Sequence, residues 1–174
     1  METKFGGFVS MIRDRIINAS IESLQTEGLR FSIDSLAEKL KISKKTIYKY
    51  FPNKEALALA MYEKYYQTIN NKMQILLGKN ENTLLSDILF LYYESKRMTR
   101  SEIFNKYKLN DVIRSYTTKQ NNDLWDTVAT TLHNSLSADE ISAMRLIIDG
   151  TFEKLCEHQA SPEIVIERLV KMIC

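Results

Sequence analysis

The sequence has little of what several large classes of protein require. Its 174 residues include two cysteines, two prolines and five glycines. Two cysteines are too few for a disulfide framework or a four-ligand zinc site, so we expect ordinary thiols in a reducing compartment. The scarcity of turn-forming residues disfavours an all-β fold. We predict no cofactor and no metal centre.

Long hydrophobic runs are missing as well. The longest extends from Ala56 to Tyr62, whereas a membrane-spanning helix needs about 20 apolar residues. The N-terminal residues also lack the apolar core of a secretion signal. We therefore expect a cytoplasmic protein that has no membrane partner.

The sequence has almost no excess of one sign of charge, since its net charge is +2, but its basic and acidic residues are unevenly distributed. Residues 1–54 hold ten basic and six acidic side chains, whereas residues 55–174 hold fourteen and sixteen. Between Lys39 and Lys54 there are six lysines and no carboxylate. This asymmetry predicts that the N-terminal part faces nucleic acid or another anionic surface.

The apolar periodicity is helical almost throughout, which predicts an all-α fold. Capping residues mark several helix starts, among them Ser32, Ser43 and Asn53, and Ser137 with Glu140 forms a predicted capping box. The predicted helices span residues 9–27, 33–40, 44–50, 54–77, 83–98, 101–107, 109–120, 121–136, 138–158 and 162–173.

Two of these helices, 33–40 and 44–50, are short and are joined by a tight turn. The small side chain of Ala37 allows them to cross closely, and Ile47 faces inward from the second helix. Such a pair describes a helix-turn-helix, whose second helix fits the major groove of DNA. With Ile47 and Phe51 buried, the outer face keeps lysines for phosphates and Thr and Tyr groups for base edges. The alternative is a solvated lysine-rich face without a role in binding nucleic acid.

The most specific motif is Tyr48-Lys49-Tyr50-Phe51 followed by Asn53-Lys54-Glu55. Over about residues 9–60, the order and spacing of the chain resemble the DNA-binding domain of TetR-family (tetracycline-repressor-type) transcriptional regulators. Two positions at which the family often has glycine hold Lys41 and Lys45 here. The operator sequence therefore does not follow from the resemblance.

The resemblance implies a domain organisation and a function. Residues 1–54 would form the helix-turn-helix domain, helix 54–77 would connect it, and residues 55–174 would form a helical ligand-binding and dimerisation domain. The expected protein is a homodimeric, sequence-specific regulator of transcription that represses from a palindromic DNA operator. A small hydrophobic or aromatic effector would release it.

The resemblance also implies roles for single residues. Helix 44–50 would read bases and nearby phosphates, and Tyr50 and Lys54 would contact phosphates. At the start of the preceding helix, Ser32 and Ser35 would contact phosphate, or Ser32 would only cap the helix. The predicted DNA-binding residues are Ser32, Ser35, Lys44, Lys45, Thr46, Tyr48, Lys49, Tyr50 and Lys54.

Two other function classes compete with this interpretation. An enzyme is disfavoured because the sequence has no Gly-rich phosphate loop, nucleophile elbow or metal-ligand cluster. A helical protein-interaction module that binds no DNA is the second alternative. Salt-dependent binding to duplex DNA separates it from a regulator.

The C-terminal part offers two further candidate sites. Aromatic side chains between helices would line an effector cavity or be ordinary core. The candidates are Phe90, Tyr93, Phe104, Tyr107, Tyr116 and Trp125. Helix 138–158 is apolar on two faces, which predicts burial against the domain core and, with helix 121–136, against a partner subunit. The predicted dimer interface consists of Ala143, Leu146, Ile147 and Gly150, and burial within one chain is the alternative.

Overall fold

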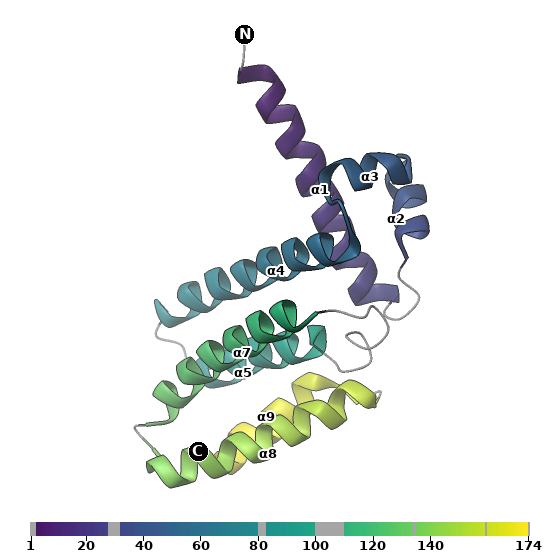
Figure 1. The fold of residues 1–174 in the computed structure, drawn as a ribbon. Coiled ribbons are helices and arrows are strands. Elements are labelled where there is room, and N and C mark those ends of the chain that lie inside the picture. The colour runs from purple at the N-terminus through teal and green to yellow at the C-terminus, as the bar shows by residue number, and fades with distance from the viewer. Residues whose placement is uncertain are drawn as a thin grey trace. The chain divides into compact units, whose positions relative to one another are not determined.

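The computed structural model describes residues 3–27, with backbone only for 3–10, and residues 32–79, 83–99, 110–133, 135–158 and 160–173. In this part of the chain there are eight α-helices and no strands, so the predicted all-α fold is confirmed (Figure 1). The helices are α1 (Thr3–Glu27), α2 (Ile33–Leu40), α3 (Lys44–Tyr50), α4 (Lys54–Leu77), α5 (Leu84–Met98), α7 (Asp111–Leu132), α8 (Ala138–Glu157) and α9 (Pro162–Ile173).

Side-chain caps explain where several helices begin. At α2, Ser32 Oγ accepts a hydrogen bond from Ser35 N at 3.1 Å, and Ser35 Oγ accepts one from Ser32 N at 3.2 Å. At α4, Asn53 Oδ1 accepts a backbone N–H at 2.7 Å. At α8, Glu140 Oε2 accepts from Ser137 N at 2.8 Å, which completes the predicted capping box. These local bonds satisfy backbone donors that the first helical turn leaves free.

Three predicted boundaries are wrong. Helix α7 ends at Leu132, four residues before the predicted end at residue 136. The predicted helices 109–120 and 121–136 form one helix, α7, because Asn121 is a buried helical residue and not a break. Its Oδ1 accepts a hydrogen bond from Tyr66 Oη at 2.9 Å. In addition, α1 begins at Thr3, six residues before the predicted start at residue 9. The predicted helix 101–107 lies outside the described residues.

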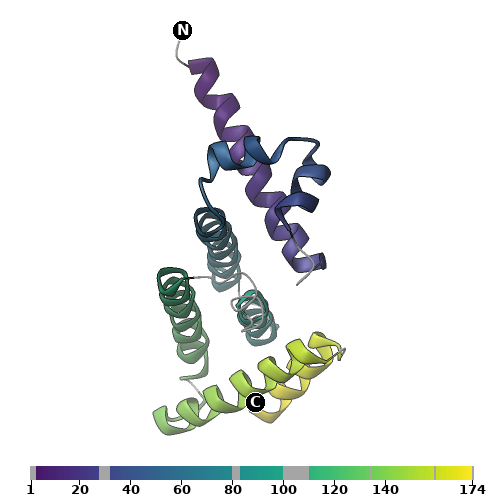
Figure 2. The same cartoon turned by 45° about the vertical axis from the view of Figure 1, so that its right-hand side comes forward.

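Contacts divide the chain into two compact units, and the division falls inside α4. The first unit contains α1, α2, α3, α4 as far as Tyr65, and the start of α7 as far as Arg114. The second unit contains the remainder of α4 and α7 together with α5, α8 and α9. Within it, α5 contacts both α8 and α9, and Figures 1 and 2 show α8 and α9 side by side.

The turn between α2 and α3 contains a left-handed residue. Lys41 has φ 54° and ψ 43°, and it is the only residue other than glycine with a positive φ in the part of the chain described. Its N–H donates to the carbonyl of Glu38 at 3.0 Å, and Ile42 N donates to the carbonyl of Ala37 at 3.0 Å. These bonds close α2 and turn the chain toward α3.

A glycine at this turn is expected to stabilise the protein. Lys41→Gly removes the steric penalty that a side chain meets in the left-handed region, and we expect about 0.5–1 kcal/mol of added stability in urea denaturation. Lys45→Gly is the matched control, because it removes the same charge from a right-handed helical position and should destabilise by a similar amount. Equal effects of the two substitutions would contradict this account of the turn.

Candidate nucleic-acid interface

A small apolar core fixes α2 and α3 in the first unit. Leu36, Ile47 and Phe51 have exposed fractions of 0%, 1% and 3%, which confirms the predicted burial of Ile47 and Phe51. The guanidinium of Arg13 on α1 lies 5.3 Å from the centroid of the Phe51 ring. Because these core contacts fix the inward side of α3, the opposite side of the helix faces outward in a defined orientation.

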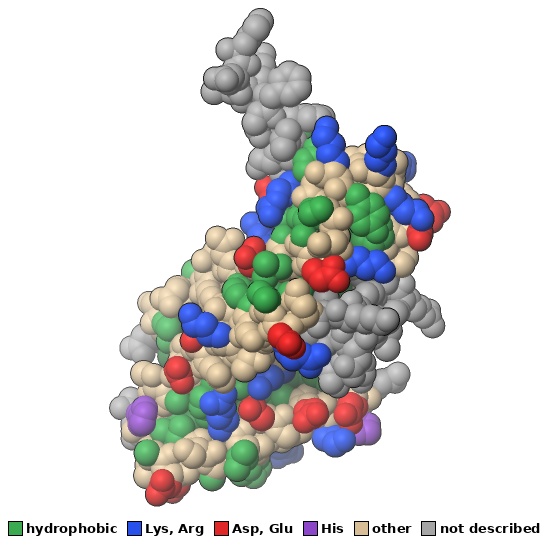
Figure 3. All heavy atoms as spheres, in the orientation of Figure 1, with side chains coloured by type: hydrophobic (Ala, Val, Ile, Leu, Met, Phe, Trp, Pro, Cys, Tyr) green, Lys and Arg blue, Asp and Glu red, His purple; other side chains and the backbone are tan. Residues whose placement is uncertain are grey.

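The outward side of α3 carries both cationic and aromatic groups. Lys45 and Lys49 are exposed, and Tyr48 between them has an exposed fraction of 40%. Tyr48 is the only aromatic residue among the exposed large hydrophobic residues of the described chain. Figure 3 shows several Lys and Arg side chains on the surface around α2 and α3. This surface combines groups that bind phosphates with one that reaches base edges.

Some of the predicted hydroxyl contacts are already engaged within the domain. Thr46 Oγ1 lies 2.9 Å from Ser43 Oγ, which also caps α3 by accepting from Thr46 N at 3.0 Å. Ser32 Oγ donates to Ser35 Oγ at 3.1 Å in the α2 cap. Among the predicted base-reading residues, Tyr48 is therefore more available than Thr46.

The lysines between positions 39 and 54 divide into two groups. Lys39 Nζ lies 3.2 Å from Glu22 Oε2, and Lys44 Nζ forms an ion pair with Asp34. The hydrogen bond to Asp34 and the carboxylate charge raise the pKa of Lys44. In the described part of the chain, no ion pair engages the other four, which are Lys41, Lys45, Lys49 and Lys54.

Lys54 differs from the others in its place on the fold. It is exposed and is the first residue of α4, where free backbone N–H groups favour an anion. Tyr50, the last residue of α3, is half-buried. Tyr50 precedes the short segment at Pro52 and Lys54 follows it, so the two predicted phosphate contacts lie close together in the sequence. Their role stays a prediction.

The second unit contains an aromatic cluster whose central residues, Tyr92 and Phe152, were not among the predicted cavity residues. The predicted residues Tyr93 and Trp125 are buried and are connected through the rings of Phe152 and Tyr92. The Tyr92 ring lies 5.6 Å from that of Trp125 and 6.1 Å from that of Phe152, and the rings of Tyr93 and Phe152 are 5.4 Å apart. Tyr92 follows Ile88 by one helical turn on the buried face of α5, a spacing that could have identified it.

The other predicted cavity residues are dispersed. Phe90 lies beside Tyr93 with ring centroids 6.3 Å apart, while Tyr116 contacts Tyr66 at 6.0 Å. Phe104 and Tyr107 lie outside the described residues. The structure thus brings Phe90 and Tyr93 together and places Tyr116 in a separate ring contact.

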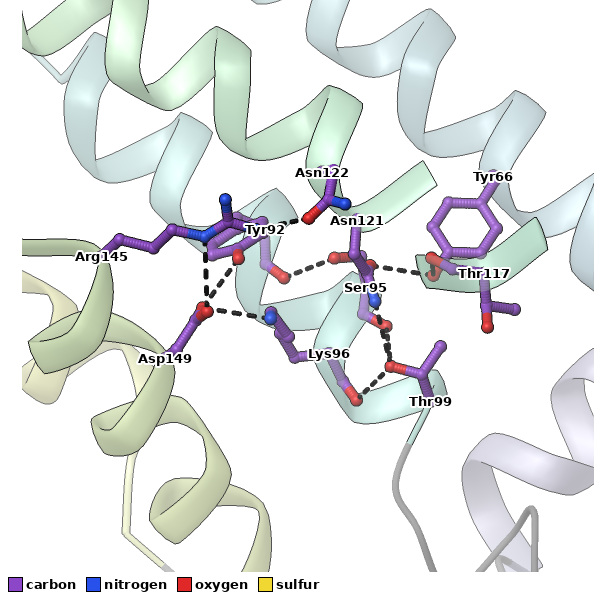
Figure 4. A network of polar contacts seen from close by, with 10 residues as sticks. All are labelled: Tyr66, Tyr92, Ser95, Lys96, Thr99, Thr117, Asn121, Asn122, Arg145 and Asp149. Carbon is purple, nitrogen blue, oxygen red and sulfur yellow. Dashed lines mark hydrogen bonds and ion pairs between the residues drawn. The ribbon is translucent and has the colours of Figure 1, made fainter. Parts of the chain in front are cut away.

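A polar network adjoins the aromatic cluster (Figure 4). Asp149 on α8 accepts a hydrogen bond from Tyr92 Oη at 2.7 Å and lies 3.1 Å from Lys96 Nζ. Arg145 Nε is 3.7 Å from the second Asp149 oxygen, and its guanidinium lies 5.5 Å from the Trp125 ring centroid. Burial, together with the Asp149 carboxylate, raises the pKa of Tyr92, so its hydroxyl stays protonated as a donor. The network joins α8 to α5.

Removing the Tyr92 hydroxyl tests this network. Tyr92→Phe keeps the ring contacts but removes the shortest hydrogen bond to Asp149, which then retains only Lys96 and Arg145 in this network, and we expect a loss of about 1–2 kcal/mol in denaturant-induced unfolding. Tyr93→Phe is the matched neighbour: burial raises its pKa and its polar partner is the Cys156 thiol, a weak acceptor. A Tyr93→Phe loss as large as that of Tyr92→Phe would argue against a special role for Asp149.

The two apolar faces of α8 have different surroundings. Ile141, Ile148 and Phe152 are buried in the second unit, as predicted for the core face. The second face is exposed: Leu146 and Ile147 have exposed fractions of 78% and 46%, and Ala143 and Gly150 are also exposed. Burial of this face within one chain, the alternative interpretation, is therefore wrong.

Helix 121–136 contributes little to this exposed face. Most apolar side chains of this segment that belong to α7, namely Leu124, Trp125, Val128 and Leu132, are buried inside the second unit, and Ala129 is half-buried. Exposed apolar side chains come from α9 instead, where Ile164 and Met172 have exposed fractions of 62% and 74%.

An open groove of about 550 Å³ is lined by side chains of α8, of the segment that follows it, and of α9. Its lining residues are Ile147, Gly150, Thr151, Lys154, Leu155, His158, Ala160 and Val165. None of the predicted effector-cavity residues line it, whereas Ile147 and Gly150 of the predicted dimer interface do. The groove is thus part of the exposed face of α8.

Among the described residues, no group of three or more His, Cys, Asp or Glu side chains is arranged to hold a metal ion. No helix in the same residues is long and apolar enough to cross a membrane.

Comparison with known proteins adds evidence on the family. Residues 16–61 match the family described as bacterial regulatory proteins, tetR family. This segment contains α2, α3 and the outward lysines and tyrosine described above. No curated protein sequence matches the chain.

Solved structures share the fold over nearly the whole chain. A transcriptional regulator of the TerR/AcrR family from Aquifex aeolicus is 19% identical, with a TM-score of 0.63, covering 93% of this chain and 99% of its own. NemR of E. coli in its reduced form is 17% identical, with a TM-score of 0.66 and coverage of 92% and 94%. FadR of Bacillus subtilis in complex with stearoyl-CoA is 16% identical, with a TM-score of 0.61 and coverage of 91% and 96%.

The family match lies on the helix-turn-helix, and the fold similarity extends over the helices that follow it. Members of this family regulate transcription and are not enzymes, which agrees with the expected function class. The helix-turn-helix segment of the chain therefore matches the tetR family of bacterial regulatory proteins, and the chain as a whole has the fold of TetR/AcrR-family transcriptional regulators.

Proposed function

We propose that this regulator is a repressor that binds a palindromic operator in the cytoplasm and leaves it when a small hydrophobic or aromatic effector binds. The observation that carries the proposal is the exposed face of α3. There Tyr48 stands between Lys45 and Lys49, neither of which is engaged in an ion pair in the described chain, while Ile47 anchors the helix from behind. This arrangement suits insertion into a major groove.

We assign DNA binding to residues 1–54 and effector binding and dimerisation to residues 55–174, connected by helix 54–77. In the DNA-binding part, Lys45 and Lys49 of α3 together with Lys54 would bind phosphates, and Tyr48 would read bases. Ser32, Ser35, Thr46 and Tyr50 would add contacts at the rim, where their side chains are partly exposed.

Dimerisation is assigned to the exposed apolar face of α8. Ala143, Leu146, Ile147 and Gly150 place apolar or small groups in solvent on one side of a helix whose other side is buried. An exposed apolar face of this kind marks an interaction site. A two-fold dimer would present two copies of α3 to successive major grooves, about 34–36 Å apart.

The effector class is inferred from the aromatic cluster of the second unit. Tyr93, Trp125 and Phe152 offer an apolar, aromatic environment, with the Asp149 network as its polar edge. Ligand sites are commonly of this composition. The structural neighbour FadR of Bacillus subtilis is in complex with stearoyl-CoA, which supports an effector with an apolar portion.

The test is to let the purified protein select fragments of genomic DNA and to sequence what it retains. We expect a pseudo-palindrome whose half-sites are about 10 base pairs apart, or a multiple of that spacing, overlapping a promoter. Release of the selected duplex by a fatty acyl or aromatic compound would support the effector. Retention of no preferred sequence would favour the alternative, a protein-interaction module.

A further inference from the structure

Asp34 and Lys44 form an ion pair at the edge of the DNA-facing surface. Lys44 is the first residue of α3, and Asp34 lies in the first turn of α2. Their side chains are 58% and 70% exposed, so the pair lies in solvent and not in the core. Exposed ion pairs contribute little to the stability of a fold. A stabilising role therefore does not explain the pair well.

The pair changes the charge that α3 offers to DNA. A lysine that neutralises a phosphate releases a counterion and adds to the salt dependence of binding. Lys44 already has a carboxylate partner, and that carboxylate is itself repelled by phosphates. Lys45 and Lys49 on the same helix have no such partner among the described residues.

We propose that Asp34 is a positioning residue that withholds Lys44 from the DNA backbone and so limits the affinity for DNA of any sequence. This inference rests on the proposed DNA-binding function and goes beyond it, because it assigns a role in DNA binding to an acidic residue. Weak binding to bulk DNA leaves more protein free to find its operator, since non-specific sites greatly outnumber the specific one. Phosphate contacts at this surface then depend on the lysines that lack a carboxylate partner.

The experiment measures binding to a fluorescent random-sequence duplex over a series of salt concentrations. Asp34→Asn frees Lys44, and we expect a slope of log affinity against log salt that is steeper by about 0.9 for each protein chain bound. If the two lines meet near 1 M salt, the variant binds about eightfold more tightly at 0.1 M for each such contact.

Glu38→Gln is the matched control. Glu38 lies one turn further along α2 on the same face, and its removal changes the net charge by the same amount. Its carboxylate has no cationic partner in the described part of the chain. We expect it to change affinity by less than about twofold and to leave the slope unchanged.

Lys44→Gln completes the cycle without altering the first turn of α2. In the wild-type background it should barely change the slope, whereas in the Asp34→Asn background it should abolish the gain. The proposal is overturned if Asp34→Asn and Glu38→Gln behave alike, or if the gain persists without Lys44. A wild-type protein that bound the duplex with no salt dependence would instead overturn the DNA-binding function itself.

Discussion

A Gly150→Glu protein is expected to run as a monomer of 20.3 kDa in light scattering, whereas the wild type runs at twice that mass. The variant should keep its helical circular dichroism but bind the selected operator about 100-fold less tightly, or worse. Two linked half-site contacts gain about two to four orders of magnitude over one, and the monomer loses that gain.

The structure makes this substitution selective for the interface. A Cβ built on Gly150 meets no atom within 4 Å, so the new side chain has room within its own chain. Leu146 and Ile147 are exposed beside it on α8. In a dimer formed through this face, an unpaired carboxylate is buried among apolar groups, which costs several kcal/mol.

Two controls separate charge from position. Gln74→Glu adds the same charge at an exposed position of α4 and should stay dimeric. Gly150→Ala adds only a methyl group and should raise helix stability by about 1 kcal/mol in the isolated chain. A Gly150→Glu protein that remained a dimer would place the interface away from this face of α8.

Tyr48→Ala is expected to remove about 1–3 kcal/mol of discrimination between the selected operator and a scrambled duplex. The side chain is 40% exposed on the outward side of α3 and is not engaged in a cap, unlike Thr46. Because non-specific binding depends chiefly on phosphates, the affinity for the scrambled duplex should change much less. Competition titrations with both duplexes measure the ratio.

Comparison variants identify the group that reads the base. Tyr48→Phe keeps the ring and tests the hydroxyl alone. Lys49→Ala should weaken binding to both duplexes similarly and lower the salt slope by about 1 for each subunit bound. If Tyr48→Ala left the specificity ratio unchanged, α3 would not be the helix that reads the sequence through this residue.

Local chemistry explains why so many helix starts could be predicted. Ser32, Asn53 and Ser137 bond to backbone groups within three residues, so their effect is visible in a short stretch of sequence. Asn121 shows the limit of such reasoning. An asparagine looks like a helix break until its partner Tyr66, 55 residues earlier, is placed beside it.

The same distinction holds for the candidate sites. The outward lysines and Tyr48 follow from helical periodicity once Ile47 is taken as buried, and the structure places them on the outward side of α3. The pairing of Lys44 with Asp34 depends on the angle between two helices, which periodicity does not specify. Tyr92, by contrast, follows Ile88 by one helical turn on the buried face of α5, so its place in the aromatic cluster could have been predicted from periodicity.

The most direct test of DNA recognition is the affinity of the wild-type protein for the selected duplex and a scrambled one across a series of salt concentrations. The account predicts straight log–log lines with a slope of about −4 or steeper, and a preference of about a thousandfold or more for the selected site. A flat salt dependence, or equal affinity for the two duplexes, would contradict it.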